Sequence, residues 1–86
     1  MPWYVYILRC GDNTLYTGVT DDVPRRLAAH RSGKGAKYTR GRGPLELAYI
    51  EEVPDKSAAL RREAAVKRLR HSEKERLIED RKSLLG

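Results

Sequence analysis

The sequence predicts an α+β fold: a small three-stranded antiparallel sheet flanked by helices, in the order β-β-α-β-α-α. Two contrasting compositions indicate it. Residues 3–10 are aromatic and β-branched, as is typical of strands, whereas residues 56–85 contain no Gly or Pro and are rich in Ala, Leu, Arg, Lys and Glu. The length of 86 residues is the third observation, because it leaves room for a single domain over residues 1–86.

The chain begins with a predicted β-hairpin. Two alternating sets of side chains in residues 3–10 are apolar, which indicates a strand covered on its two faces. They are Trp3, Val5 and Ile7 on one side and Tyr4, Tyr6, Leu8 and Cys10 on the other. Residues 14–20 resume a strand-like composition after the turn residues Gly11, Asp12 and Asn13. We therefore expect two antiparallel strands joined by a three-residue loop.

A first helix is predicted over about residues 23–32, and Pro24 suits its first turn. Side-chain oxygens that can cap this helix come immediately before it. These capping candidates are Thr20, Asp21 and Asp22. Residues 32–44 are rich in glycine and basic residues, which favours a basic loop with one short helical turn around residues 36–39.

The remaining elements are a third strand over residues 45–53 and two helices over about residues 56–69 and 73–83. Ser72 is a suitable N-cap for the last helix, and Glu75 stands at the third position of a capping box. A sheet that is apolar on both faces needs cover on both, so we expect helices on each side of it.

Eighteen Lys and Arg residues oppose twelve Asp and Glu, which gives a net charge of +6. Such an excess favours a polyanionic partner, above all nucleic acid. The single cysteine, Cys10, excludes an internal disulfide and a multi-thiolate zinc site. The longest uncharged apolar run, residues 3–8, is too short for a membrane span and no signal peptide is recognised, so we expect a soluble cytoplasmic protein. The oligomeric state stays open, because a short sheet edge can pair with a second copy.

Two tyrosines form the first candidate site. If the hairpin loop sets Cys10 opposite Thr14, then Tyr6 faces Gly18 and has Tyr16 as a diagonal neighbour on the same face of the sheet. Gly18 then leaves an open notch beside Tyr6. Two phenols would border this hollow and could take part in chemistry. Alternatively, both tyrosines are simply favourable strand residues with solvated hydroxyls.

Arg26 and His30 form a second candidate pair on the first helix. Their spacing of four residues stacks them on one face, at the edge of the apolar stripe formed by Val23 and Leu27. An arginine there can grip a phosphate and stabilise the charge that develops during phosphoryl transfer. The alternative is a solvated arginine whose stem covers the core and a histidine that caps the end of the helix.

Glu63 is the third candidate, because its neighbours Ala59, Leu60 and Val66 place it on the apolar stripe of its helix. A carboxylate that points inward is costly to bury unless a cation or a metal compensates. One carboxylate with water ligands suits a Mg²⁺ ion that also binds a substrate phosphate. A plain surface ion pair with Lys67, four residues further on, is the equally supported alternative.

Residues 25–42 form a basic stretch without any Asp or Glu. Its glycines let the backbone approach a phosphate chain, and Tyr38 offers a ring on which a base can stack. We expect this stretch to contact nucleic acid, and a solvated charged segment is the alternative. Its basic residues are Arg25, Arg26, Arg31, Lys34, Lys37, Arg40 and Arg42.

In their order, these features resemble the GIY-YIG nuclease domain over about residues 3–80. Tyr4-Val5-Tyr6 and Tyr16-Thr17-Gly18 stand in the places of the two tripeptides that name the family, and residues 16–30 (YTGVTDDVPRRLAAH) resemble its most recognisable segment. The segments GAKYTRGRGP and SAALRREAAVKRL are similar to those of its small stand-alone bacterial members. The nuclease domain of the eukaryotic structure-specific resolvase subunit is similar over the same stretches.

The resemblance implies a metal-dependent endonuclease that hydrolyses phosphodiester bonds of DNA, with structure-dependent or single-strand activity, in repair, recombination or uptake. It implies that Tyr6 and Tyr16 are active-site phenols, Arg26 the catalytic arginine and His30 an auxiliary polar residue. It also implies that Glu63 is the single protein ligand of one Mg²⁺ or Mn²⁺ ion. A phenol with a pKa of about 10 is a poor base, and Arg26 or the metal could lower that pKa. The expected nucleic-acid contacts are Arg25, Lys34, Lys37, Tyr38, Arg40, Arg42 and Lys67.

The sequence also departs from the family pattern. Tyr4 replaces a glycine and Thr17 an isoleucine, although neither position supplies the reacting group. Larger members have an asparagine beyond the glutamate helix, whereas the only asparagine here is Asn13, which leaves that role vacant or to Lys67. Two other functions stay open: a nucleic-acid-binding module of the same fold without activity, and a nuclease subunit that is active only with a partner protein.

Overall fold

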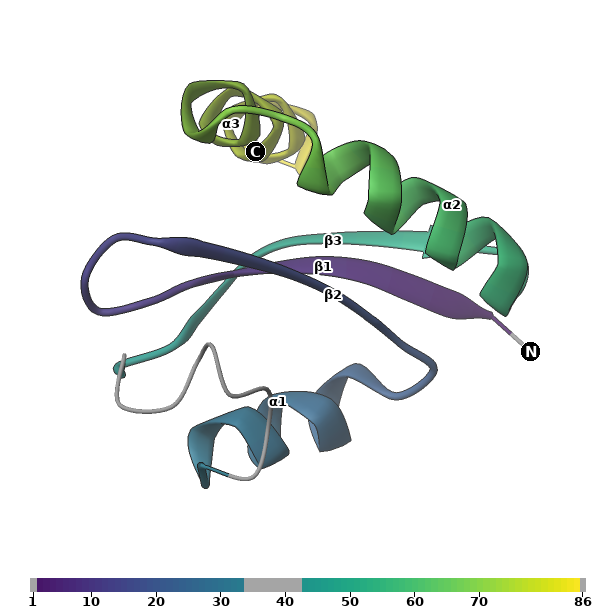
Figure 1. Ribbon diagram of the computed structural model, residues 1–86, viewed down its shortest axis with the longest axis horizontal. Coiled ribbons are helices and arrows are strands. Elements are labelled where there is room, and N and C mark those ends of the chain that lie inside the picture. The colour runs from purple at the N-terminus through teal and green to yellow at the C-terminus, as the bar shows by residue number, and fades with distance from the viewer. Residues whose placement is uncertain (1, 34–42, 86) are drawn as a thin grey trace.

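The protein folds as a three-stranded antiparallel sheet covered by helices on both faces (Figure 1). The computed structural model describes residues 2–33 and 43–85. The elements follow the order β1 (Trp3–Arg9), β2 (Leu15–Thr20), α1 (Val23–Arg31), β3 (Glu46–Val53), α2 (Lys56–Lys67) and α3 (His71–Leu85). In space the strand order is β2-β1-β3, with α1 below the sheet and α2 and α3 above it in Figure 1. The predicted fold class and element order are therefore confirmed.

The β1–β2 hairpin has the predicted register. Its loop is closed by hydrogen bonds from the Cys10 N–H to the Thr14 carbonyl and from the Asn13 N–H to the Cys10 carbonyl, each 2.9 Å long. Asn13 has a φ of 67°, the left-handed conformation that a three-residue hairpin loop requires at its last position. The hairpin consequently places Tyr6 opposite Gly18.

The central strand β1 is buried on both faces. Ile7 points toward α2 and α3, where it joins an apolar core completed by Leu15, Tyr49, Val66 and Ile78. Leu8, on the α1 side, is likewise fully buried. The pairing of β1 with β3 shifts between Ile7 and Leu8, so that Ala48 is an extra residue on β3, as in a β-bulge. The bulge lets Ala48 and Tyr49 both pack on the α2–α3 core.

The predicted cap of α1 is confirmed. Asp22 is the N-cap, and its side chain accepts a 3.1 Å hydrogen bond from the Arg25 backbone N–H. Pro24 occupies the first turn, where a missing N–H costs no hydrogen bond. Capping thus fixes the start of the helix that carries Arg26 and His30.

The start of α3 differs from the prediction. The helix begins at His71, and Glu73 accepts a 2.8 Å hydrogen bond from the Arg70 backbone N–H, so Glu73 rather than Glu75 is the acidic partner of the cap. The expected capping box of Ser72 and Glu75 is therefore wrong. Tertiary structure explains the difference, because the Glu75 carboxylate binds Arg9 instead. Among the described residues, no helix is both long and apolar enough to cross a bilayer.

The Arg9–Glu75 ion pair connects the end of β1 to α3. Arg9 donates two parallel hydrogen bonds of 2.7 and 2.6 Å to the two Glu75 carboxylate oxygens, a bidentate arrangement. These bonds lower the pKa of Glu75 from 4.5 to about 2. Because its pKa is depressed in the folded state, Glu75 stabilises the fold above pH 4.5, and this contribution is lost as the pH falls through about 2.

We predict that Glu75→Gln lowers the free energy of unfolding by about 1 kcal/mol at pH 7, since the side chains of Arg9 and Glu75 are 26% and 32% exposed and solvent screens the pair. The difference from wild type should shrink toward pH 2. Urea unfolding followed by circular dichroism at several pH values measures it, with the exposed Glu52→Gln as the matched control. A difference that is independent of pH would contradict this assignment.

Candidate active site

Tyr6 and His30 meet in the interior between the sheet and α1. The Tyr6 hydroxyl lies 2.9 Å from Nε2 of His30, in hydrogen-bond contact, and the two residues are only 3% and 2% exposed. Tyr6 comes from the central strand and His30 from the last turn of α1. His30 therefore faces the sheet, so the alternative role as a mere helix cap does not describe its side chain.

Tyr16 completes a cluster of three rings. Its ring centroid lies 5.3 Å from that of His30 and 6.4 Å from that of Tyr6, with tilted or edge-on geometry. The register pairs Leu8 with Tyr16, which places both tyrosines on the α1 face of the sheet as predicted. Tyr16 is only half-buried. The cluster is therefore closed at Tyr6 and open toward solvent at Tyr16.

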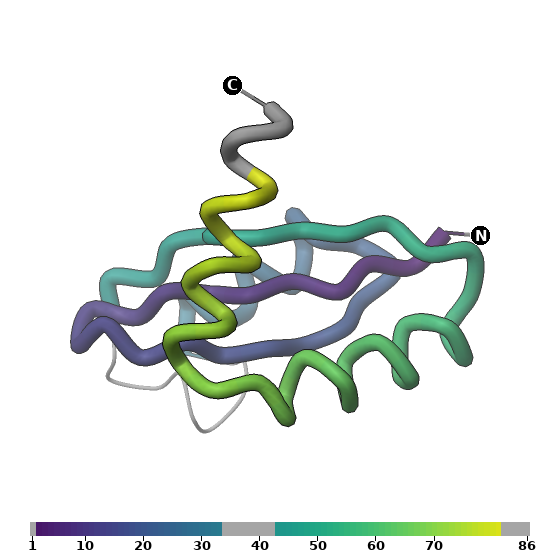
Figure 2. The backbone as a smooth tube through the Cα atoms, turned by 90° about the horizontal axis from the view of Figure 1, so that it is seen from above, coloured from purple at the N-terminus to yellow at the C-terminus, as the bar shows by residue number. Residues whose placement is uncertain are grey.

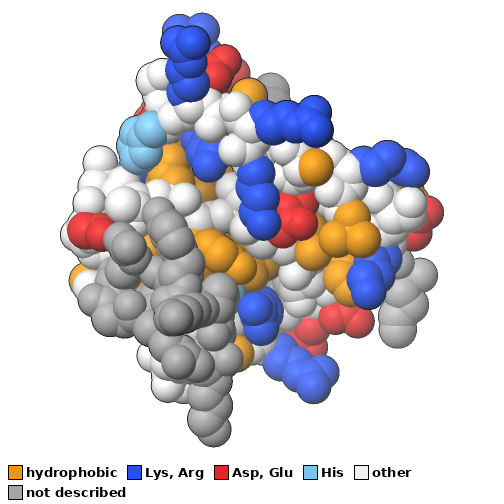
Figure 3. All heavy atoms as spheres, in the orientation of Figure 1, with side chains coloured by type: hydrophobic (Ala, Val, Ile, Leu, Met, Phe, Trp, Pro, Cys, Tyr) orange, Lys and Arg blue, Asp and Glu red, His pale blue; other side chains and the backbone are white. Residues whose placement is uncertain are grey.

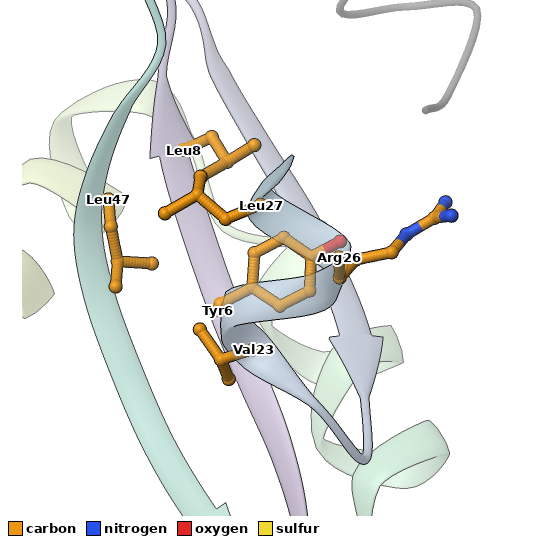
Figure 4. A pocket seen from close by; sticks show the side chains of 6 residues that line it. All are labelled: Tyr6, Leu8, Val23, Arg26, Leu27 and Leu47. Atoms are coloured by element: carbon orange, nitrogen blue, oxygen red, sulfur yellow. The ribbon is translucent and has the colours of Figure 1, made fainter. Parts of the chain in front are cut away.

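Gly18 is required by the path of the Tyr6 side chain. A Cβ atom on Gly18 would lie 2.5 Å from the Tyr6 hydroxyl oxygen and 2.7 Å from its Cζ. The expected open notch beside Tyr6 is thus wrong in one respect, because the phenol of Tyr6 itself fills it. Beneath the ring, Leu8, Val23, Leu27 and Leu47 close the space so that no water molecule fits (Figure 4).

Arg26 brings a positive charge to the two phenols. Its stem lines the apolar space around Tyr6, and its guanidinium points out of that space (Figure 4). Interaction with the hydroxyls of Tyr6, first of all, and of Tyr16 raises the pKa of Arg26, which stays charged. Desolvation by burial raises the pKa of Tyr6; Arg26 acts in the expected direction and lowers that pKa, but burial outweighs it.

His30 is uncharged at neutral pH. Burial, followed by the nearby charge of Arg26, lowers the pKa of His30 below its ordinary value of 6.5. Tyr6, with its raised pKa, is also uncharged. Arg26 therefore provides the charge at this hydrogen-bonded pair, and the arrangement favours an anion, such as a phosphate, in front of the phenols.

Glu63 approaches from the opposite side of the sheet. Figure 2 shows α2 running alongside β2, an edge strand, so a side chain of α2 can reach past that edge. The Glu63 side chain is 19% exposed, and Oε2 lies 3.3 Å from Nζ of Lys67, whose side chain is 54% exposed. The carboxylate is therefore mostly buried, as its place on the apolar stripe predicts, and it also forms the ion pair with Lys67. Its negative charge contributes to the raised pKa of Tyr6, which places it within electrostatic reach of the cluster.

The donor set fits one hard divalent cation. Within the described part of the chain, no group of three or more His, Cys, Asp and Glu could enclose a metal. A single carboxylate, Glu63, completed by water and substrate phosphate, is nevertheless a normal environment for Mg²⁺. Such an ion would neutralise the negative charge of Glu63, which contributes to the raised pKa of Tyr6.

The expected nucleic-acid contacts are only partly placed. Arg25 is exposed and lines a hollow on α1 together with Arg26. Lys67 lines a second hollow with Tyr16, and two residues that sequence reasoning missed, Thr17 and Lys74, line it as well. No spacing along the chain signals this group, because the turn between α2 and α3 brings it together. The remaining expected contacts lie outside the described residues: Lys34, Lys37, Tyr38, Arg40 and Arg42.

A β-hairpin that brings Tyr6 and Tyr16 to one face of the sheet, followed by a helix that carries Arg26 and His30, is the arrangement expected of a nuclease domain of the GIY-YIG class. The family model of the GIY-YIG catalytic domain matches residues 2–76, so the chain belongs to the GIY-YIG nuclease family. The resemblance found from the sequence is thereby confirmed.

Relatives and solved structures agree with this assignment. The chain is 56% identical over 77 residues to a UPF0213 protein of Natronomonas pharaonis, covering 90% of this chain and 91% of that protein. It is 51% identical over 82 residues to the UPF0213 protein YhbQ of Salmonella typhimurium, covering 95% and 82%. The solution NMR structure of a UPF0213 protein from Bacillus halodurans has a TM-score of 0.59 at 53% identity, covering 92% and 84% of the two chains. A protein of E. faecalis, also solved by NMR, has a TM-score of 0.65 at 38% identity, covering 93% and 85%.

We predict that Gly18→Val displaces the Tyr6 ring and breaks its contact with His30, because even a Cβ would lie 2.5 Å from the hydroxyl oxygen. The variant should lose about 1–3 kcal/mol of stability and all of the DNA cleavage expected of a GIY-YIG nuclease. Urea unfolding and plasmid nicking measure the two effects. Gly43→Val is the matched control, since a Cβ there meets nothing within 4 Å. A folded Gly18→Val protein that cuts at the wild-type rate would contradict the role given to this contact.

Proposed function

We propose that the protein is a metal-dependent endonuclease that hydrolyses phosphodiester bonds in DNA. One observation carries the proposal: Arg26 lines the same space as Tyr6, whose ring lies 6.4 Å from that of Tyr16, and Glu63 is within electrostatic reach of Tyr6. These residues come from the consecutive elements β1, β2 and α1 and from α2, which follows much later in the sequence. The convergence unites an anion-binding cation, two proton-bearing hydroxyls and a carboxylate, which are the groups that phosphodiester hydrolysis needs.

Arg26 is the proposed phosphate ligand. Its planar guanidinium can donate two hydrogen bonds to phosphate oxygens, and its charge stabilises the additional negative charge of the transition state. The raised pKa of Arg26 keeps that charge at any physiological pH. Because its stem packs in the apolar space beside Leu27, the guanidinium is held near the phenols before substrate binds.

The two tyrosines are proposed to take part in proton transfer at the scissile phosphate. Tyr6 is held by His30 at 2.9 Å, so its hydroxyl has a fixed direction. His30 is a positioning residue in this scheme, because its lowered pKa disfavours a proton on the imidazole. Tyr16 is half-buried and faces the open side of the cluster, where a water molecule can approach the phosphate. A tyrosine in that position can accept the proton of the attacking water as a phenolate, after its own hydroxyl proton has passed to solvent.

Glu63 is the proposed single protein ligand of one Mg²⁺ or Mn²⁺ ion. Bound there, the ion would supply a Lewis acid for the phosphate oxygens and a positive charge that lowers the pKa of the phenols. The Glu63–Lys67 ion pair, with 3.3 Å between Oε2 and Nζ, orients the carboxylate meanwhile. Lys67 is half-exposed and can turn toward a phosphate when the carboxylate takes another partner.

The proposed substrate is DNA in a branched or single-stranded form, cut during repair, recombination or uptake. Support for a nucleic acid comes from the net charge of +6 and from Lys and Arg side chains spread over the α2 and α3 side of the molecule (Figure 3). An open active-site face with a single half-buried phenol suits a flexible strand, which can bend to present one phosphate.

We predict that wild-type protein nicks plasmid DNA or cuts oligonucleotide flaps with Mg²⁺ and that EDTA abolishes the activity. Tyr6→Phe and Glu63→Gln should each reduce the rate by about 100-fold or more, because the first removes the hydroxyl that bonds His30 and the second removes the proposed metal ligand. Tyr4→Phe and Glu52→Gln are the matched controls, with the same chemical change elsewhere in the chain, and should cut like wild type.

The same assay separates the alternatives. Equal cutting by all variants would show that the site is wrong or that a contaminant cuts. Salt-sensitive binding without metal-dependent product would favour a non-catalytic binding module. Cutting that appears only after a second protein is added would indicate a nuclease subunit.

A further inference from the structure

A second candidate site lies beside the cluster, at the edge of β2. Leu15, Tyr16 and Thr17 of this edge strand line a hollow of about 330 Å³ together with Lys67 of α2 and Lys74 of α3. One water molecule needs only about 10–15 Å³ of such space, so this open hollow admits a group as large as a phosphate. Figure 2 shows the turn from α2 to α3 next to this strand.

Thr17 gives the first indication of a ligand. It is 3% exposed, and within the described part of the chain its hydroxyl has no hydrogen-bond partner. A buried hydroxyl without a partner costs free energy, and valine would fill the same space without this cost. The hydroxyl is therefore explained if a ligand in the adjoining hollow supplies the missing partner.

The two lysines indicate the charge of that ligand. Lys74 forms no ion pair with the acidic residues that the structure describes, and Lys67 is paired with Glu63 but remains 54% exposed. No acidic residue lines the hollow. Two ammonium groups and a hydroxyl donor together favour an anion with several acceptor oxygens, as a phosphate has.

Tyr16 connects this hollow to the candidate active site. The same side chain lines the hollow and packs against the His30 ring at 5.3 Å between centroids. A nucleic-acid strand with one phosphate at Arg26 would pass Tyr16 and meet the lysines on the other side. We infer that the hollow holds a neighbouring backbone phosphate of the substrate strand, bound by Lys67, Lys74 and the Thr17 hydroxyl. The inference rests on the proposed function, since it assigns a phosphate next to the scissile one.

Binding of a labelled single-stranded oligonucleotide in EDTA tests the inference without any cleavage. We expect Lys74→Gln to weaken binding about fivefold and to reduce the slope of log K against log salt concentration by about 0.7, the value for one phosphate contact on a single strand. Arg61→Gln is the matched control: it likewise removes one positive charge, here from α2, and Arg61 is exposed and bonds only Ser57 among the described residues. Equal effects of Lys74→Gln and Arg61→Gln would overturn the inference.

Thr17→Val distinguishes a Thr17 hydroxyl that binds a ligand from one that has only a structural role. Loss of an unpartnered buried hydroxyl should raise the melting temperature by about 4 °C, while binding of the oligonucleotide weakens about threefold. A variant that is stabilised but binds like wild type would overturn the role of Thr17 as a ligand. If wild type binds and cuts DNA normally and neither variant differs from the control, this inference alone fails and the proposed nuclease stands.

NMR titration of the ¹⁵N-labelled protein identifies the source of the phosphate. Amide signals of Thr17 and Lys74 should shift with the oligonucleotide at concentrations far below those needed with inorganic phosphate, because the strand also binds Arg26. Saturation of both signals by inorganic phosphate at the same concentrations would assign the hollow to a free phosphate and overturn the inference.

Discussion

The Tyr6 side chain crosses from the central strand over Gly18 to reach His30, and the other groups of the site are arranged around this contact. It requires the hairpin register that sets Tyr6 opposite Gly18, and it requires α1 to lie close enough for a 2.9 Å hydrogen bond. Because Arg26 precedes His30 by one helical turn, the same docking brings the guanidinium to the phenols. The buried Tyr6–His30 contact thus links the hairpin register to the position of Arg26.

The two faces of the sheet have different tasks. The α2–α3 side holds the apolar core around Ile7 and Ile78, whereas the α1 side holds the ring cluster. Glu63 is on the α2–α3 side, on the helix that runs alongside the edge strand β2. It pairs there with Lys67, and its charge still raises the pKa of Tyr6. An edge position explains how a mostly buried carboxylate is tolerated, since complete burial in the core would leave its charge uncompensated.

Short-range rules predicted much of this structure, and tertiary contacts decided the remainder. Turn residues 11–13 fixed the hairpin register, which is why the Tyr6–Gly18 pairing could be predicted before the fold was known. The side-chain direction of Tyr6, which fills the notch, depends on the helix packed below it. Glu75 does not cap α3 as expected, because its carboxylate binds the guanidinium of Arg9, 66 residues away in sequence. Lys74 carries no local signal, since only the turn between α2 and α3 brings it to Tyr16.

The pH titration of the His30 ring, followed by NMR on uniformly ¹⁵N-labelled protein, tests the central contact most directly. Burial against Tyr6 and the charge of Arg26 predict that His30 stays neutral until the pH falls below its ordinary pKa of 6.5. Protonation then opposes folding, because the unfolded chain binds that proton more readily. Titration of the His30 ring at or above pH 6.5 would show a solvated imidazole and contradict the buried Tyr6–His30 pair.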